Sequence, residues 1–540
     1  MTVEITDIRK SLIGEGTPIP GPFGPRGLIY ADYVASGRSL TFIEDAIRTH
    51  VMPFYGNTHT ETSFTGRRTT QLREMARAAV RRAVGADDGH AVIFTGSGAT
   101  AAADKLVRAL LLRGLDKRSV VFVGPYEHHS NDLPWRESGA SIERIPLNSD
   151  GAICLETLEA RLAAYPDAPV KIGAFAAASN VTGVVSDLRG IARLMHAQGG
   201  WCVADFAAAG PYMQISLAES VPGAADRIDA AFVSPHKYAG GPGASGLLIA
   251  DRTFLDTGRP TVTGGGTVSY VTENHHEYVT NPERREEGGT PAIIENIRAG
   301  MVLALKRTVG EDKVEERELA MTDRMERALR AIPGLELLGP VGAARVGIFS
   351  FNLRVGGRML HHNYVVALLN DLFGIQARGG CSCAGPYGHH LLGIDRETTE
   401  RHEREVQLGY SAFRPGWARL GVNWFFEEAD VDRIARAVEF VAQHGLALLP
   451  LYRLDLKDGV WRARAGVADT PPARLSDLWD GDAAPTGEAP DFEVAMAEAK
   501  ALLSKVPTDP EQLQMTAEQE ELRWFWLPHE VARPVEMEQA

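Results

Sequence analysis

Between about residues 28 and 300, short continuous hydrophobic runs alternate with longer stretches whose apolar residues recur at helical spacing. A short apolar run bounded by turn residues is typical of a buried strand, whereas the Ala/Leu-rich stretch from Gly98 to about Leu112 predicts a helix. The expected strands are Ala91–Thr95, Ser119–Val123, Lys171–Ala177 and Trp201–Asp205. Strands that alternate with helices predict an α/β fold with a large, mainly parallel sheet.

A different pattern follows from about residue 301 to 450, where long charged helices flank short strands. The helices are expected at 301–331, 361–373 and 427–444, and the strands at 347–353 and 419–424. This mixture predicts a second, smaller α+β domain.

The two ends of the chain lack both patterns. The first residues carry several prolines among glycines and are expected to form an extended arm. The last part is acidic and contains the aromatic segment Trp524–Pro528, so we expect it to dock onto a surface of the chain itself or of a partner. The predicted parts are an N-terminal arm (1–27), a large domain (28–300), a small domain (301–450) and a C-terminal extension (451–540).

Composition and charge exclude several classes of partner. The chain has 540 residues, 44% of them hydrophobic, so it can bury more than one core. Its 56 Lys and Arg against 70 Asp and Glu give a net charge of −14 without any basic block, which argues against nucleic acid. No basic segment followed by an apolar run begins the chain, and no stretch approaches the about 18 uninterrupted apolar residues of a membrane span. We therefore expect a cytoplasmic protein.

The cysteines are too few and too irregularly spaced for structural cross-links. Cys154, Cys202, Cys381 and Cys383 can make neither a disulfide framework nor a zinc site, so we expect free thiols in a reducing compartment and no metal. Cys154 and Cys202 lie in apolar segments and are expected in the core. Cys381 and Cys383 lie in a Gly-rich loop near Arg378, a setting that favours the thiolate.

The chemistry is indicated most strongly by Lys237, in the run Ser234–Tyr238, and by Asp205, which ends an apolar strand. A lysine can hold an aldehyde cofactor as a Schiff base, and a carboxylate can keep a pyridine nitrogen protonated. This pair is the minimum equipment for the chemistry of pyridoxal 5'-phosphate (PLP).

Other strand ends carry residues that this cofactor needs. The turn Gly96–Thr100 leads directly into the expected helix, whose first amides and dipole favour a phosphate dianion. His128 follows one strand, where its ring could lie over a flat cofactor, and Asn180 follows another, where its amide could bond a phenolic oxygen. Ligands of open α/β sheets gather beyond the carboxyl ends of the strands, so these turns should converge on one crevice.

Taken together, these segments resemble the class V aminotransferase group of fold-type I PLP enzymes, nearest in their motifs to cysteine desulfurases and selenocysteine lyases. The resemblance covers about residues 28–445 and implies the fold-type I architecture. The cofactor residues that it implies are Gly98, Ala99, Thr100 and Ser234 at the phosphate, His128, Asn180 and Asp205 around the ring, and Lys237 with its neighbour His236 at the Schiff base.

The resemblance also implies a homodimer whose phosphate site is completed across the interface. Thr267, in a Gly-Gly-Gly-Thr run, and Thr290, in a Gly-Gly-Thr-Pro run, are similar to loops that reach the phosphate from the neighbouring subunit. Ala35 and Asn57 lie in segments similar to those beside the substrate, Tyr30–Gly37 and Tyr55–His59. An amino acid is therefore the expected substrate.

The segment Gln376–Pro386 resembles the desulfurase loop in which an arginine, here Arg378, precedes the catalytic cysteine by five residues. That register selects Cys383 as the residue that attacks the sulfur of L-cysteine, and it implies a sulfur-acceptor protein as a partner. Arg419 resembles the strand arginine that grips the substrate carboxylate, a task suited to its planar pair of donors. Lys237, His128 and Cys383 are thus the predicted catalytic residues.

The sequence also departs from the desulfurase pattern. Ala208 stands where desulfurases commonly carry Gln, Ala101 stands where Glu often follows the phosphate turn, and Gly-Gly-Cys-Ser precedes Cys383 where many carry His. Transamination, elimination and epimerisation of another amino acid therefore remain alternatives.

Two hypotheses from other classes are weaker. The run Gly241–Gly246 fits a dinucleotide fingerprint but leads into a strand and opens no helix, which argues against an NAD-dependent enzyme. A catalytically silent scaffold whose working surface is the C-terminal extension is disfavoured by the intact Asp205 and Lys237.

Overall fold

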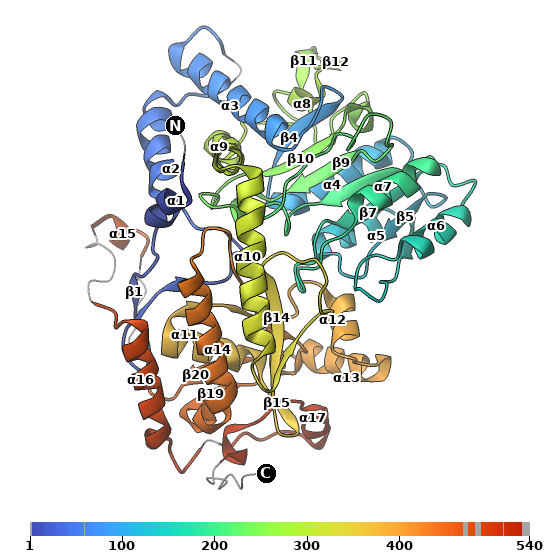
Figure 1. Ribbon diagram of the computed structural model, residues 1–540. Helices are drawn as coiled ribbons and strands as arrows, with labels where there is room; N and C mark the ends of the chain where they lie inside the picture. The colour runs from blue at the N-terminus through green and yellow to red at the C-terminus, as the bar shows by residue number, and fades with distance from the viewer. Residues whose placement is uncertain (1–2, 59, 468–473, 481–487, 511, 532–540) are drawn as a thin grey trace.

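The computed structural model describes residues 3–58, 60–467, 474–480, 488–510 and 512–531 (Figure 1). His59 and several acidic and proline-bearing parts of the C-terminal extension lie outside the described residues. A large sheet with helices on its faces occupies one end of the molecule, and a smaller sheet with its own helices occupies the other (Figure 1).

The large sheet has seven strands in the order β4-β10-β9-β8-β7-β5-β6. Strands β9, β8, β7, β5 and β6 run parallel, whereas β10 is antiparallel to both β4 and β9. This confirms the predicted α/β fold with a mainly parallel sheet. The strand bounds are His90–Gly96 (β4), Val120–Val123 (β5), Ser141–Arg144 (β6), Lys171–Ala176 (β7), Trp201–Asp205 (β8), Ala230–Val233 (β9) and Gly246–Asp251 (β10).

Helices bury both faces of this sheet, which is why its strands read as continuous apolar runs. Alternate residues of β4 face opposite ways: Ala91 and Ile93 pack with α4, and Val92 and Phe94 lie in the core on the other face. The helices around the large sheet are Thr41–Ala46 (α2), Phe64–Ala83 (α3), Gly98–Leu112 (α4), Leu133–Arg136 (α5), Leu155–Ala163 (α6), Leu188–Ala197 (α7), Pro282–Arg285 (α8) and Ile293–Val309 (α9).

The small sheet is antiparallel and runs in the order β13-β14-β18-β17, with β15 paired to β14. Its strands are Leu335–Leu337 (β13), Ile348–Val355 (β14), Arg358–Leu360 (β15), Arg378–Gly380 (β17) and Trp417–Gly421 (β18). The accompanying helices are Glu311–Arg330 (α10), His362–Phe373 (α11), Gly385–Leu391 (α12), Arg396–Gln407 (α13) and Glu428–Leu448 (α14). A short parallel pair, β3 (Ile29–Tyr30) with β16 (Ile375–Gln376), links the N-terminal segment to this region.

Two expectations about helices differ from the structure. The stretch expected as one helix over 301–331 is divided into α9 and α10 at Gly310, whose φ of +103° no helix accommodates. The N-terminal arm is not wholly extended, since Ile5–Ser11 form helix α1 before the short pair β1 (Pro18–Ile19) and β2 (Arg26–Gly27). A capping box between Glu4 and Asp7 starts α1, and the fully buried Ile8 anchors it to the core.

The C-terminal extension packs onto its own chain, beside the small sheet (Figure 1). Phe525 forms a backbone bridge with Met359 of β15, the indole of Trp526 donates to the Val355 carbonyl at 2.8 Å, and Phe525 and Leu527 are both 0% exposed. Of the two surfaces expected for the aromatic cluster, the structure therefore supports the chain's own. The elements of the extension are Tyr452–Asp455 (β19), Val460–Ala463 (β20), Asp477–Asp480 (α15), Phe492–Leu502 (α16) and Ala517–Leu522 (α17).

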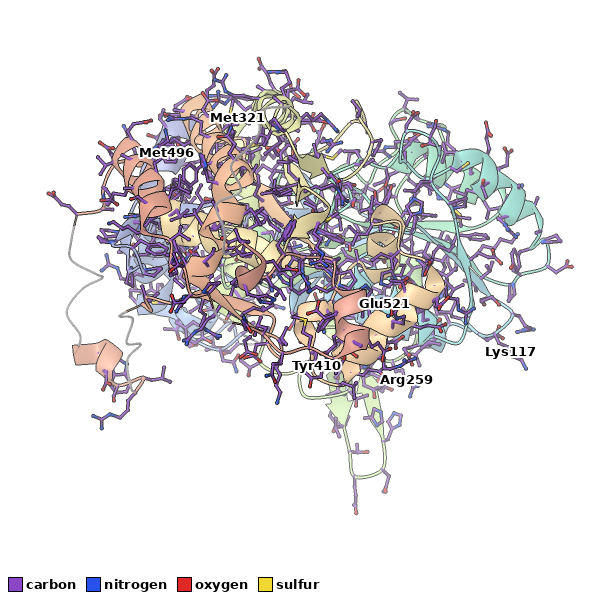
Figure 2. All side chains as sticks on the ribbon, turned by 90° about the horizontal axis from the view of Figure 1, so that it is seen from below. Lys117, Arg259, Met321, Tyr410, Met496 and Glu521 are labelled. Atoms are coloured by element: carbon purple, nitrogen blue, oxygen red, sulfur yellow. The ribbon has the colours of Figure 1, made fainter. Side chains whose placement is uncertain are left out.

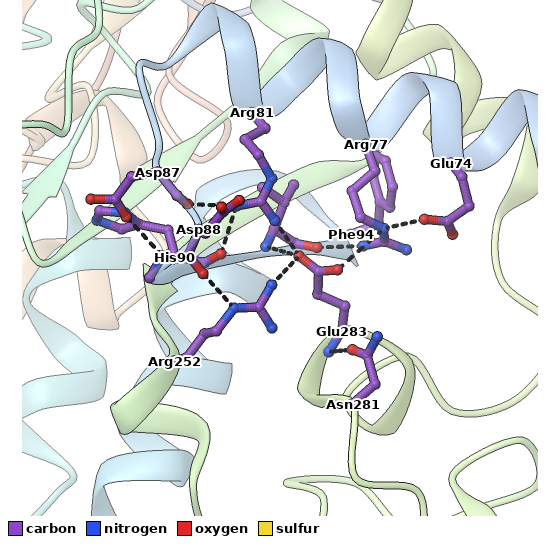
Figure 3. A network of polar contacts seen from close by, with 12 residues as sticks. Glu74, Arg77, Arg81, Asp87, Asp88, His90, Phe94, Arg252, Asn281 and Glu283 are labelled. Atoms are coloured by element: carbon purple, nitrogen blue, oxygen red, sulfur yellow. Dashed lines mark hydrogen bonds and ion pairs between the residues drawn. The ribbon is translucent and has the colours of Figure 1, made fainter.

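A hairpin of β11 (Val268–Val271) and β12 (His276–Tyr278) projects from the body of the molecule near Arg259 (Figure 2). Helix α8 follows this hairpin in the chain, and the carboxylates of Glu283 and Glu287 hold the α8 segment against the large sheet. Glu283 accepts from Arg81 at 2.7 Å and from the Val92 amide at 2.9 Å (Figure 3). Its neighbour Glu287 pairs with Arg77 at 2.9 Å. These buried contacts fix the segment that carries the Gly-Gly-Thr-Pro run.

Candidate active site

A cavity of about 250 Å³ opens at the carboxyl ends of β7, β8 and β9, facing the small sheet. Most of the residues expected to act together line it, which agrees with the predicted convergence of the strand ends. They are Ala35, Gly98, Ala99, Thr100, His128, Asn180, Asp205, Ser234, His236, Lys237, Arg378, Cys383 and Arg419. Three expected residues, Asn57, Thr267 and Thr290, lie outside this lining.

Asp205 and Lys237 line the cavity near the ends of two adjacent strands, β8 and β9. Asp205 is the last residue of β8, and its carboxylate accepts from the Ala207 amide at 2.8 Å. Lys237 ends a single helical turn, Pro235–Lys237, that follows β9. Burial raises the pKa of Asp205, and burial lowers the pKa of Lys237 to about 8 although the nearby Asp205 charge opposes that shift. An amine with that pKa is more often neutral, and hence nucleophilic, than an exposed lysine.

The first turn of α4 forms one wall and offers backbone donors. Gly98 begins the helix with φ of +60°, and a Cβ at this position would lie 2.8 Å from Cε1 of His236. Only glycine lets the helix approach this closely. The Ala99 amide donates to Oγ of Ser234 at 3.0 Å, and the hydroxyls of Thr100 and Ser130 are 2.7 Å apart. This corner can hold an anion between helix amides and hydroxyl groups.

His128 presents a neutral ring to the cavity. Its Nδ1 accepts from the Ser130 amide at 3.1 Å, which fixes the ring orientation. Burial, reinforced by the charges of Lys237 and His129, lowers the pKa of His128 to about 4. A neutral imidazole can lie against a planar ligand without adding charge.

Glu127, immediately before His128, is a buried carboxyl that the sequence pattern singled out only as part of a motif. Its Oε2 accepts from Asn131 at 2.7 Å, while Oε1 has no partner among the described residues. Burial raises the pKa of Glu127 to about 8. The carboxyl group is therefore largely uncharged near neutral pH.

The opposite wall carries two arginines on neighbouring strands. Arg378 of β17 lies directly across from Arg419 of β18, and both pair with Asp32, at 3.0 and 3.3 Å. Arg419 is 4% exposed and also donates to the Asn180 carbonyl at 3.1 Å. Two cations share one carboxylate, so the wall keeps a net positive charge that suits a carboxylate ligand. Asp32 was not among the expected site residues, although it belongs to the segment Tyr30–Gly37 that was expected beside the substrate.

The predicted reactive cysteine lies on a tight turn that closes the cavity. Cys381–Ala384 form this turn, with the Ala384 amide donating to the Cys381 carbonyl at 3.2 Å. Cys383 is exposed and lines the cavity, whereas Cys381 is half-buried and lies outside the lining. Asn180, expected beside a phenolic oxygen, donates its amide to the Ser382 carbonyl at 2.7 Å, and its Oδ1 has no partner within the described ranges.

The residues outside the cavity form a separate group. Asn57 donates to Oγ1 of Thr290 at 3.4 Å, and the Gly289 amide donates to the Gly265 carbonyl at 2.7 Å. The two glycine-rich loops that carry Thr267 and Thr290 therefore pack against each other, away from the cavity of their own chain.

Two other motifs have simple structural explanations. The run Gly241–Gly246 leads into β10, as expected, and a Cβ at Gly246 would collide with the backbone of Gly98. Of the cysteines expected in the core, Cys202 is buried but Cys154 is only half-buried. Within the described ranges, no group of acidic, cysteine and histidine side chains could hold a metal ion, and no helix is both long and apolar enough to cross a membrane.

Comparison with known families and relatives gives one consistent result. The profile of the family described as Aminotransferase class-V matches residues 29–433. A probable cysteine desulfurase of Halalkalibacterium halodurans is 28% identical over 363 residues, covering 66% of this chain and 84% of the relative. A probable cysteine desulfurase of Staphylococcus aureus strain COL is 27% identical with the same coverage.

Solved structures agree at the level of the fold. A cysteine desulfurase from Thermococcus onnurineus NA1, in an apo structure, aligns with a TM-score of 0.66 and 22% identity, covering 82% of this chain and 99% of its own. The cysteine desulfurase CsdA from Escherichia coli aligns with a TM-score of 0.64, 22% identity and the same coverage. The part of the chain beyond residue 433 lies outside the family match.

Proposed function

Because the chain belongs to the class V aminotransferase family, we propose that it is a PLP-dependent enzyme that removes the sulfur of L-cysteine, leaving alanine and a persulfide on Cys383. The observation that carries this proposal is the placement of Lys237, Asp205 and Cys383 around one cavity. Cysteine desulfurases among the relatives support the choice of reaction within the family.

The residues present fit this cofactor. Lys237 would hold it covalently through Nζ, and Asp205 would face its ring nitrogen from the end of β8. The start of α4, with Ser234 and Thr100, offers the donors that a phosphate requires. Because Gly98 has no side chain, the start of the helix can lie close to His236. His128 has a neutral ring for stacking. When bound, PLP supplies an electron sink for the bonds of the substrate α-carbon.

The protein's own groups then divide the work. Arg419 and Arg378 bind the substrate carboxylate and orient the amino acid in the cavity. Lys237, once its amine is free, moves the proton at the α-carbon, a role suited to a pKa of about 8. Sγ of Cys383 attacks the substrate sulfur from the exposed side of the turn. An exposed thiol is also accessible to a sulfur-acceptor protein, and the free cysteines fit a reducing compartment such as the cytoplasm.

The test uses purified full-length protein reconstituted with PLP. We expect a yellow protein whose cofactor borohydride fixes onto Lys237, and which forms alanine and protein-bound sulfur from L-cysteine. A colourless protein that takes up no added PLP contradicts the assignment. Release of a keto acid or ammonia from another amino acid, without sulfur transfer, would instead support the aminotransferase or lyase alternatives.

The pH dependence of cofactor uptake provides an independent check. Burial lowers the pKa of Lys237 to about 8, so the neutral amine that reacts with an aldehyde becomes predominant as the pH rises through that value. The rate of covalent uptake by cofactor-free protein, followed by absorbance, should therefore rise with pH around 8 and level off above it. A rise that continues past pH 10, as for an exposed lysine with a pKa of about 10.4, would contradict this prediction.

A prediction for substrate binding concerns Arg419. A charge-assisted hydrogen bond contributes about 1.5–3 kcal/mol, so Arg419→Ala should weaken the apparent affinity for L-cysteine roughly ten- to hundredfold or more. The absorbance of bound cofactor should stay unchanged. The matched control is Arg414→Ala, which removes an exposed arginine of the same region that does not line the cavity. Unchanged kinetics in Arg419→Ala would transfer the role to Arg378.

We further propose that the active protein is a homodimer in which the loops of Thr267 and Thr290 complete the phosphate site of the neighbouring subunit. Thr290 is exposed and can reach that site directly, whereas Thr267 is 0% exposed and donates its hydroxyl to the Gly264 carbonyl at 2.7 Å, so its side chain shapes the loop. Their loops lie away from the cavity of their own chain, and the buried carboxylates of the α8 segment hold them in place. The nearby side chains of Met52, Phe54 and Phe64 are exposed, as expected for a surface that a second copy covers.

Subunit mixing tests this arrangement. Thr290→Asp introduces a charge that repels phosphate, so this variant and Lys237→Ala should each be inactive alone. A mixed dimer contains one site with an intact Lys237 and an intact partner Thr290, so activity should reappear when the two variants are unfolded and refolded together. Failure to regain activity, with a dimeric mass confirmed by light scattering, would contradict a shared site.

A further inference from the structure

The turn that carries Cys383 contains a second thiol, Cys381, to which the proposed reaction gives no role. The turn is held in place by its backbone: the Ser382 carbonyl accepts from Asn180 at 2.7 Å, and the Cys383 carbonyl accepts from the His129 amide at 3.0 Å. The Trp417 indole adds a bond to the Ser382 hydroxyl at 3.2 Å. In contrast, neither thiol makes a hydrogen bond within the described part of the chain. The thiols are thus free to react while the backbone stays fixed.

The turn geometry brings the two cysteines together. Ser382 and Cys383 have φ of +54° and +55°, a left-handed conformation that residues other than glycine rarely adopt. Residues two apart in an extended strand have Cα atoms about 6.6 Å apart. Folding two successive steps of 3.8 Å into a left-handed turn shortens this separation to roughly 5.5 Å, near the most common value for disulfides. The left-handed turn therefore brings the Cα atoms of the two cysteines into the range of about 4.4–6.8 Å that disulfides span, and rotation of the two side chains completes the approach of their sulfur atoms.

We propose that Cys381 is a resolving cysteine, which attacks the persulfide on Cys383 and releases its outer sulfur as hydrosulfide. This inference rests on the proposed desulfurase function and extends it, because it gives the chain a way to discharge sulfur without a protein acceptor.

The step is a thiol–disulfide exchange. The Cys381 thiolate, after losing its proton to solvent, attacks Sγ of Cys383. A bond forms between the two Sγ atoms, the sulfur–sulfur bond of the persulfide breaks, and the outer sulfur leaves with the bonding electron pair as hydrosulfide. A low-molecular-weight thiol then reduces the Cys381–Cys383 disulfide and is itself oxidised to its disulfide, which restores both thiols for the next turnover. L-cysteine is itself such a thiol, so the disulfide should persist only when L-cysteine is limiting and no other thiol is present.

The placement of the two residues fits this division of roles. Cys383 lines the cavity, where it can meet the substrate sulfur, whereas Cys381 is half-buried and lies outside the lining. Cys381 can therefore reach the inner sulfur of a persulfide without competing for the substrate.

The test is a single turnover by PLP-loaded full-length protein, with less L-cysteine than active sites and no added reductant. Alanine, free hydrosulfide and the state of the peptide containing both cysteines are measured after acid quenching and alkylation of free thiols. We expect the wild type to give equal amounts of alanine and hydrosulfide, with a peptide that has lost both free thiols without gaining sulfur. Cys381→Ser should form alanine but release at least tenfold less hydrosulfide, and its Cys383 should retain one added sulfur.

Cys154→Ser, which changes a half-buried cysteine remote from the cavity, is the matched control and should behave as the wild type. Retention of the persulfide by the wild type, or release of hydrosulfide from Cys381→Ser at the wild-type rate, overturns the resolving role. An absence of alanine from the wild type is a different result, since it overturns the desulfurase function and the resolving step with it.

Discussion

Lys237→Ala should yield a protein that no longer holds PLP covalently and whose turnover of L-cysteine at saturation falls by about 10²- to 10⁴-fold or more. Lys237 is assigned two tasks, attachment of the cofactor and movement of the α-proton, and no second lysine lines the cavity among the described residues. The loss should be visible as the disappearance of borohydride-fixed cofactor and as the absence of alanine release.

The matched control is Lys171→Met. Lys171 begins β7, at the end of the large sheet opposite the cavity, and its amine donates to the Gln198 carbonyl at 3.1 Å. This variant should keep both the colour and the activity of the wild type. If Lys237→Ala retained a borohydride-fixed cofactor, the covalent attachment would have to be assigned to another amine.

Cys383→Ala should stop desulfuration while leaving the cofactor in place. Removal of an enzyme nucleophile lowers turnover on the order of 10³-fold or more, and here it also removes the atom that receives the sulfur. The variant should still bind L-cysteine, because Arg378 and Arg419 are untouched, so a substrate-induced change in absorbance should persist without alanine or persulfide.

The neighbouring cysteine provides the comparison for this prediction. Cys381→Ala should form alanine in a first turnover, since Cys381 lies outside the cavity lining. The opposite outcome, with loss confined to Cys381→Ala, would exchange the roles of the two thiols. Retention of full desulfuration by the double variant Cys381→Ala/Cys383→Ala would exclude this turn as the sulfur acceptor.

The elements that bear the site could be predicted because they depend on local sequence. Buried parallel strands appear as continuous apolar runs, and their carboxyl ends fall on one edge of the sheet, so the sequence alone was enough to group Asp205, Asn180 and Lys237. Gly98 was identified because its motif leads into the expected helix, and Arg378 was identified because it precedes Cys383 by five residues.

The remaining features depend on contacts that sequence spacing does not reveal. Asp32 pairs with Arg378 and Arg419, which are 346 and 387 positions away in the chain. The left-handed turn at Ser382 and Cys383 is equally invisible in sequence, because the local pattern would favour glycine or asparagine at such positions. The break at Gly310 could have been anticipated, since glycine commonly ends helices.

The docked C-terminal extension implies that the part of the chain shared with the family is shorter than the part that unfolds as one cooperative unit. The family match ends at residue 433, inside α14, yet the buried Phe525 and Leu527 pack into the same core as that helix. Removing one large buried side chain costs about 2–5 kcal/mol, and a whole domain is typically stable by only about 5–15 kcal/mol. A fragment cut where the resemblance ends would therefore lose a large share of its stability, and heating the intact chain should melt the small sheet and the extension in a single transition.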